Sequence, residues 1–268
     1  MSARVPFPGR PRDPLPAPIT GTNTKSLVGL ADLAGWKAAS ALDPGLLSDA
    51  GFFMLLPAPL LAPAHDALAG TGVTVGAQDC WWDETAPTGE IAPSLLGEIG
   101  CAYAMVGHPE RRGLGEDDGA VSAKARACAL SGLVPVLCVG EDRYMPAPRA
   151  AVHTRAQLDA VLDVCPDDAP LVVMYEPAWT VGAPEPASPD HVGAVAEGLA
   201  DALHARSGPG RLMYAGAVAP GTVGDLMAAG PLDGVGLGRS AHTRDERSKV
   251  LREVLEAWHG KEAAWDAP

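Results

Sequence analysis

Eight short apolar segments recur along the chain, and segments with helical spacing separate them. The apolar segments are nearly continuous rather than alternating, which is typical of strands in a parallel sheet whose faces are covered by helices. Their ranges are 19–24, 52–58, 73–79, 103–108, 134–141, 171–177, 211–218 and 234–240. The clearest helical stretches between and after them are 120–130, 150–162, 191–206 and 244–258.

Eight strand–helix units in about 250 residues match the usual size of a (β/α)8 barrel. The sequence therefore predicts an α/β fold with one such barrel over residues 18–268, and no break in composition marks a second domain. An open, doubly wound sheet is the structural alternative, because repeated β-α-β units have the same periodicity in both folds.

Residues 1–17 precede the first apolar segment and are rich in proline. They lack the apolar stretch of a signal peptide, so we expect an extended or disordered arm. The cysteines form no C-x-x-C pair and are odd in number: Cys80, Cys101, Cys128, Cys138 and Cys165. This usage is typical of reduced thiols, and we expect a cytoplasmic protein.

The formal net charge of −13 bears on the possible partners. An acidic surface repels the phosphates of nucleic acids and of anionic membranes, so we expect neither as a partner. Any anionic ligand must then be held by a local site. No apolar run approaches the length of about 18 residues that a membrane span requires.

Polar residues and glycines follow several of the predicted strands. In a (β/α)8 barrel the C-terminal ends of the strands carry the active site. The residues at these ends are Asn23, Lys25, His108, Glu141, Glu176, Gly216, Ala217, Gly236, Gly238 and Arg239. A general base, an imidazole and a cation at one rim suit a reaction that removes a proton next to a carbonyl. The glycines and Ala217 could offer backbone N–H groups to a phosphate.

Glu176 is the candidate general base. Pro177 restricts it to an extended conformation, and an apolar neighbour such as Trp179 would raise its pKa by excluding water. His108 is the candidate electrophile, because Pro109 suits the first position of a helix whose positive end would favour a neutral imidazole.

Four segments together resemble the triosephosphate isomerase family. "YAMVGHPERR" is similar to the family's histidine motif on strand four, and "VPVLCVGE" is similar to its strand five. "YEPAWTVG" resembles the segment with the catalytic glutamate and the hinge of a mobile lid. "AQDCWWDETAPTGEIAPSLLGEIG" resembles the third loop, which reaches into the neighbouring subunit. The matches run in order from Gly21 to about Ala241.

The resemblance implies an isomerase that interconverts a small phosphorylated ketose and aldose through an enediolate. Dihydroxyacetone phosphate and glyceraldehyde 3-phosphate are the default pair, in glycolysis and gluconeogenesis, and no cofactor or metal is required. The enzyme would be a homodimer, with Thr88 at the tip of the third loop inserted into the partner.

The resemblance also assigns roles to individual residues. Glu176 would shuttle the proton and His108 would polarise the carbonyl. Supporting roles fall to Asn23, to Lys25, to Glu110 as the brace of Lys25, and to Cys138 as a packing residue. Backbone N–H groups for the phosphate would come from Gly182 in the lid and from Gly238.

The chain departs from the family pattern at several positions. The first strand ends in "NTKS", which keeps Asn23 and Lys25 but lacks the family's aromatic residue. Pro109 stands where the family has serine. The lid tip is "GAPE", and Pro184 cannot adopt the positive φ that a glycine allows, so the shape or motion of the lid must differ.

The phosphate site changes most. Ala215-Gly216-Ala217 replaces a Gly-Gly-Ser segment, and the lost hydroxyl donor would cost about 1.5–3 kcal/mol if nothing replaced it. Arg239 replaces a glycine; its guanidinium could hold the phosphate in a fork, or it could point outward and block the pocket. "GLGRSAH" resembles the branch of the family that acts on phosphorylated four-carbon ketoses.

Three alternatives to a triose phosphate isomerase stay open. One is an isomerase of a four-carbon ketose phosphate such as erythrulose phosphate. Another is a non-catalytic paralogue that binds a sugar phosphate, which the Ala217 and Pro184 changes motivate. The last is an aldolase that forms a Schiff base on Lys25. "GVGLGR" lacks the last glycine of a dinucleotide fingerprint, and no residue spacing predicts a metal site.

Overall fold

The computed structural model describes residues 15–265, and eight parallel strands in it form a closed barrel in chain order. The strands are β1 (Ile19–Asn23), β2 (Phe52–Leu56), β3 (Thr74–Ala77), β4 (Tyr103–Val106), β5 (Val134–Val139), β6 (Leu171–Tyr175), β7 (Gly210–Ala215) and β8 (Gly234–Leu237). The first and last strands pair in register, with Ile19 opposite Gly234 and Thr22 opposite Leu237. The predicted barrel is confirmed, and the open sheet is excluded.

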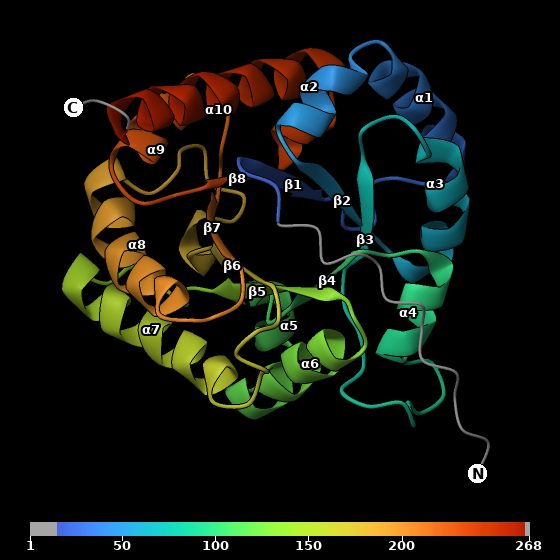
Figure 1. The fold of residues 1–268 in the computed structure, drawn as a ribbon, viewed down its shortest axis with the longest axis horizontal. Helices are drawn as coiled ribbons and strands as arrows, with labels where there is room; N and C mark the ends of the chain where they lie inside the picture. The colour runs from blue at the N-terminus through green and yellow to red at the C-terminus, as the bar shows by residue number, and fades with distance from the viewer. Residues whose placement is uncertain (1–14, 266–268) are drawn as a thin grey trace.

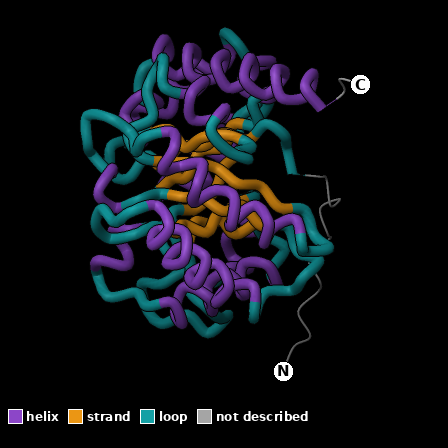
Figure 2. Tube along the Cα trace, turned by 90° about the vertical axis from the view of Figure 1, so that its left-hand side faces the viewer, coloured by secondary structure: helices purple, strands orange, loops and turns teal. Residues whose placement is uncertain are grey.

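Helices form a ring outside the strands, as Figures 1 and 2 show. They are α1 (Leu30–Ala41), α2 (Pro44–Asp49), α3 (Leu61–Leu68), α4 (Pro93–Ile99), α5 (Pro109–Gly113), α6 (Asp118–Leu130), α7 (Ala147–Leu162), α8 (Pro189–His204), α9 (Val223–Ala228) and α10 (Arg244–Trp265). Short 3-10 turns follow β2, β6 and β8: η1 (Ala58–Leu60), η2 (Ala178–Thr180) and η3 (Arg239–Ala241). Within the described residues, no helix is long and apolar enough to cross a bilayer.

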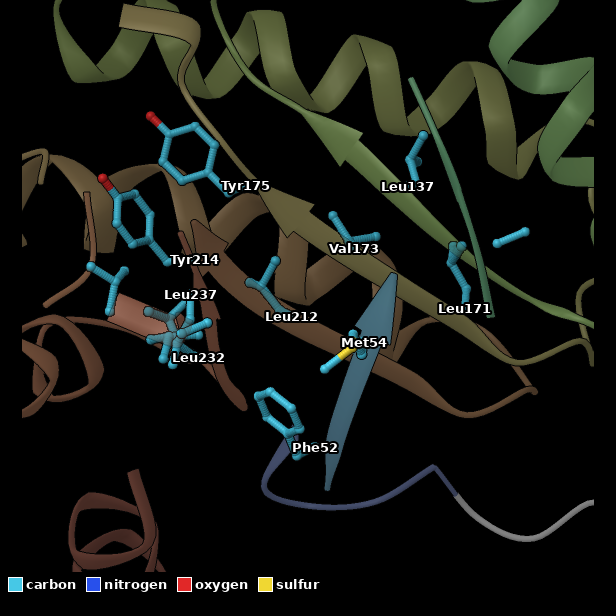
Figure 3. Close-up of a cluster of buried hydrophobic side chains, with 14 of the residues drawn as sticks. Phe52, Met54, Leu137, Leu171, Val173, Tyr175, Leu212, Tyr214, Leu232 and Leu237 are labelled. Atoms are coloured by element: carbon cyan, nitrogen blue, oxygen red, sulfur yellow. The ribbon is translucent and has the colours of Figure 1, made fainter. Parts of the chain in front are cut away.

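The strands bury both of their faces, which explains their continuous apolar sequences. On β2, Phe52 and Met54 pack outward against the helices, whereas Phe53 and Leu55 point into the barrel. Figure 3 shows part of the outer layer, with Tyr175 and Tyr214 side by side. Because side chains alternate along a strand, the residue after an outward Tyr175 is directed to the barrel axis.

The barrel interior is narrow where glycines line it. The phenyl ring of Phe53 occupies the space that a side chain on Gly21 would need. At Gly234 a Cβ atom would collide with the backbone of Ile19 on the neighbouring strand. The close approach of β1 and β8 therefore requires a residue without a side chain at this point.

The predicted proline-rich arm, residues 1–17, lies mostly outside the described residues. Its described end is packed: Leu15 is buried in the interior of the barrel. The guanidinium of Arg211, at the start of β7, donates hydrogen bonds to the carbonyls of Leu15 (2.8 Å) and Pro16 (2.9 Å). This segment therefore covers the N-terminal end of the barrel.

Candidate active site

A cavity of about 530 Å3 opens at the C-terminal ends of the strands. The loops after β1, β4, β6, β7 and β8 line it. The predicted site residues among its lining are Asn23, Lys25, His108, Glu110, Glu176, Gly182, Gly216, Ala217, Gly238 and Arg239. The tertiary structure thus brings together residues from five separate segments of the chain.

Glu176 follows β6 and is held at the rim by its backbone N–H, which donates to the Val139 carbonyl at 2.8 Å. Its carboxylate is 13% exposed, and its buried Oε2 has no hydrogen-bond partner in the described part of the chain. Burial raises the pKa of Glu176 to about 7; the charge of Lys25 lowers it and that of Glu110 raises it. The group is therefore a carboxylate of unusually high basicity, aimed into a cavity.

His108 faces this carboxylate, with 3.5 Å between its Nε2 and Glu176 Oε2. It caps α5, because its Nδ1 accepts a hydrogen bond from the Glu110 backbone N–H at 3.1 Å. An Nδ1 that accepts a hydrogen bond carries no proton, so the proton of the neutral ring lies on Nε2. Burial and the charge of Lys25 lower the pKa of His108 to about 4. The imidazole is therefore a neutral N–H donor, and the predicted helix after it is confirmed.

Lys25 adopts a positive φ of 49°, and its side chain lines the cavity. The turn is stabilised by the Lys25 backbone N–H, which donates to Asn23 Oδ1 at 2.9 Å. The ammonium forms an ion pair with Glu110. Hydrogen bonding with Lys25 lowers the pKa of Glu110. Glu110 thus holds the Lys25 ammonium close enough to His108 for its charge to lower the pKa of the imidazole.

The opposite side of the cavity consists of turns after β7 and β8 and of residues 177–187, here called the lid. Gly216 (φ 122°) and Ala217 (φ 50°) both have positive φ angles. The guanidinium of Arg239 donates to the carbonyl of Ala183 in the lid at 3.4 Å. Arg239 thus reaches the lid from β8 while it lines the cavity, rather than pointing away from it.

Three residues singled out from the sequence lie elsewhere. Thr88 is exposed in the loop between β3 and α4, away from the cavity lining. Cys138 is buried inside the barrel, and burial raises the pKa of its thiol well above the usual range. Glu141 follows β5, where the sequence predicts it, but its carboxylate is fully buried and binds Tyr175 and Trp179 instead of lining the cavity.

Several cavity residues are not predicted by the sequence patterns used above. Met105 and Met174 form part of the cavity wall. Side chains alternate along β4 and β6, and both methionines occupy positions that point into the barrel, so the strand pattern could have identified them. Leu27, His242 and Glu246 also line the cavity, but they lie in loops or in the first turn of α10, where no period applies.

A second groove, of about 510 Å3, lies between α9 and α10. Small residues line much of it, and its Glu253 carboxylate is bound to the Gly221 backbone N–H at 2.8 and 2.9 Å. Its lining residues include no counterpart of the base and imidazole pair. The chemistry of the protein is therefore expected at the first cavity.

Comparison with known proteins agrees with this geometry. The triosephosphate isomerase family profile matches residues 23–254. The chain is 39% identical over 216 residues to L-erythrulose-1-phosphate isomerase of Pectobacterium atrosepticum, covering 78% of this chain and 83% of that protein. It is 38% identical over 202 residues to triosephosphate isomerase of Thermus thermophilus, covering 71% and 80%. The crystal structure of triosephosphate isomerase from Bartonella henselae superposes with a TM-score of 0.76 at 27% identity, covering 90% and 99%. The chain belongs to the triosephosphate isomerase family.

Proposed function

We propose that the protein is an enzyme that interconverts a small phosphorylated ketose and aldose, with triose phosphate as the default substrate. The observation that carries the proposal is the pair formed by Glu176 and His108. The two groups face each other across 3.5 Å, and burial drives the pKa of the acid up to about 7 and that of the imidazole down to about 4. Opposite shifts of this kind fit a general base and a neutral electrophile, a pairing for which triosephosphate isomerase is itself the standard example.

In the proposed reaction Glu176 removes a proton from the carbon next to the substrate carbonyl. The electron pair of the broken C–H bond forms a C=C bond, and the carbonyl oxygen becomes an enediolate oxygen. His108 Nε2–H donates a hydrogen bond to that oxygen, and Lys25 adds positive charge nearby. The hydroxyl on the deprotonated carbon then passes its proton to the enediolate oxygen, and the electron pair of that O–H bond forms the new C=O bond. The electron pair of the C=C bond takes the proton back from Glu176 at the former carbonyl carbon, so the carbonyl has moved by one position.

The substrate phosphate is proposed to bind at the turns after β7 and β8 and at the lid. Candidate donors are the backbone N–H groups of Gly182, Gly216, Ala217 and Gly238 and the guanidinium of Arg239, all of which line the cavity. We expect Arg239→Ala to raise KM by roughly ten- to hundredfold, because a hydrogen bond to a charged group contributes about 1.5–3 kcal/mol. An unchanged KM would exclude the Arg239 contact.

A four-carbon ketose phosphate is the second candidate substrate. The relative from Pectobacterium atrosepticum named L-erythrulose-1-phosphate isomerase, at 39% identity, favours it. The replacement of a serine hydroxyl at Ala217 and the guanidinium of Arg239 also indicate a rebuilt phosphate site.

Steady-state assays with triose phosphates and with erythrulose phosphate would decide between the two, with Glu176→Gln as the inactive control. Deuterium from D2O should enter the substrate in the wild type and not in the control. If no label enters either compound, the chain is a binding paralogue and the enzymatic proposal is wrong. Borohydride trapping on Lys25 would instead indicate a Schiff-base aldolase.

We further propose that the enzyme is a homodimer in the cytoplasm, with glycolysis and gluconeogenesis as its pathways. The exposed position of Thr88 on the loop after β3 supports an interface there. The five cysteines, all within the described residues, form no disulfide, which supports a reducing compartment. Sedimentation of the wild type and of Thr88→Asp tests the interface, since a charge there should favour monomers. Deletion of residues 1–14 should leave activity unchanged if residues 18–268 form the catalytic domain.

A further inference from the structure

A buried carboxylate outside the cavity joins three polar side chains. Glu141 follows β5 and is fully buried. It accepts hydrogen bonds from the Tyr175 hydroxyl, at 3.2 Å from each oxygen, and from the Trp179 indole N–H at 3.0 Å. The Nε2 of His191 lies 3.1 Å from Glu141 Oε1 and 3.0 Å from the Tyr175 hydroxyl. None of these four residues is part of the cavity lining.

The groups around Glu141 come from both sides of the lid. Trp179 lies in η2 at the start of the lid, and His191 lies in the first turn of α8, just after its end. The Ala178 backbone N–H also donates to the Glu141 carbonyl at 3.0 Å. One residue of the β5 loop thus holds the two flanks of the lid together.

The charge of Glu141 requires a partner because a buried ion without one is strongly unfavourable. Among the described residues, the basic side chain in contact with Glu141 is His191, whose Nε2 lies 3.1 Å from Glu141 Oε1. The neighbouring Asp142 and Arg143 are exposed. Burial and the charge of Glu141 raise the pKa of Tyr175, so the phenol stays protonated and donates to the carboxylate.

We propose that His191 is a positioning residue for the lid and that it acts through the carboxylate of Glu141. Its imidazole Nε2 lies within hydrogen-bonding distance of both the carboxylate and the Tyr175 hydroxyl, and it fixes the carboxylate that binds the Trp179 indole. His191 does not line the cavity, so we expect any effect on turnover to pass through the lid. The inference rests on the proposed function, because a lid matters only if it covers a reacting substrate.

The competing explanation is that His191 only fills space. Its ring packs edge-on against Trp179 and tilted against Tyr144, with centroids 5.9 Å apart in both pairs. Simple packing predicts that the effects of changing His191 and Glu141 are independent. Action through Glu141 predicts that they are coupled.

A double-mutant cycle separates the two explanations. His191→Gln replaces the imidazole with an amide, and Glu141→Gln replaces the carboxylate with an amide that keeps an acceptor for Trp179. We expect each single variant to lower kcat/KM by about tenfold, with kcat and KM both changed. The double variant should lose about the same factor, not the roughly hundredfold of independent effects. Additive losses, or an unchanged H191Q enzyme, would overturn the proposal.

Two controls accompany the cycle. His204→Gln makes the same chemical change at an exposed position of the same helix and should leave kcat/KM unchanged. If H191Q does not fold, the smaller H191N replaces it in the cycle.

A spectroscopic measurement tests the contact through Glu141 without an activity assay. In protein labelled with fluorotryptophan, the fluorine resonance of Trp179 is identified as the one lost in Trp179→Phe. It should shift in ligand-free H191Q and stay in place in H204Q; an unmoved resonance in H191Q refutes the contact through Glu141. A wild type that turns over neither sugar phosphate would refute the proposed function but leave this measurement valid.

Discussion

Replacement of the candidate base should abolish catalysis and stabilise the protein. Glu176 is 13% exposed, its Oε2 accepts no hydrogen bond within the described residues, and burial raises its pKa from 4.5 to about 7. The neutral amide of Glu176→Gln has no buried charge to desolvate. The rise in the pKa of Glu176 corresponds to about 3 kcal/mol of lost stability, which is an upper estimate because the pocket can admit water.

The pH dependence of this effect has a definite sign. Below pH 4.5 the carboxyl of Glu176 is protonated in both the folded and the unfolded chain, so it changes stability little. Between 4.5 and about 7 the unfolded chain releases the proton while the folded chain retains it, and the stability of the wild type falls. Above about pH 7 both forms are ionised and the full difference is present.

Urea unfolding of wild type and E176Q at matched protein concentration checks this reasoning. We expect E176Q to be more stable by up to about 3 kcal/mol near pH 8 and nearly equal to the wild type near pH 4.5. Glu197→Gln, at an exposed position of α8, serves as a control with little expected effect. A stability difference that does not grow between these pH values would show that Glu176 is not desolvated as described.

Three other perturbations test separate parts of the structure. The kcat/KM of the wild type should fall about tenfold per pH unit below about pH 7, because Glu176 becomes protonated. His108→Gln should lower kcat but keep this acidic decrease, because the pKa of His108 is about 4. If the decrease disappears in H108Q, it belongs to the imidazole. Lys124 is 1% exposed and forms ion pairs with Asp79 and Glu116, so Lys124→Met should destabilise the fold by about 3–5 kcal/mol in urea unfolding. A loss of less than about 1 kcal/mol would contradict a buried ion pair. Gly234→Ala should prevent accumulation of folded protein, judged by circular dichroism, because the Cβ would overlap the neighbouring strand; normal folding would refute the close approach.

The sequence alone determined the strands, most of their ends and the identity of the central residues. Continuous apolar runs predicted all eight strands because both faces of each strand are buried. The helices predicted at 120–130 and 150–162 correspond to α6 (Asp118–Leu130) and α7 (Ala147–Leu162), which begin two or three residues earlier at their caps. Glu176 and His108 were identifiable because each lies within two residues of the end of an apolar strand and is followed by a proline.

Only the tertiary structure decided how these residues meet. Closure of the barrel depends on hydrogen bonds between β1 and β8, more than 200 residues apart, and no local pattern encodes that pairing. The same holds for Glu141, which has the sequence position of a rim residue but is buried because Tyr175, Trp179 and His191 surround it. Arg239 contacts the lid through the carbonyl of Ala183, a partner available only once the loops after β6 and β8 lie side by side. Strand periodicity is a local property of the chain, whereas burial and charge compensation depend on residues that folding brings together from distant segments.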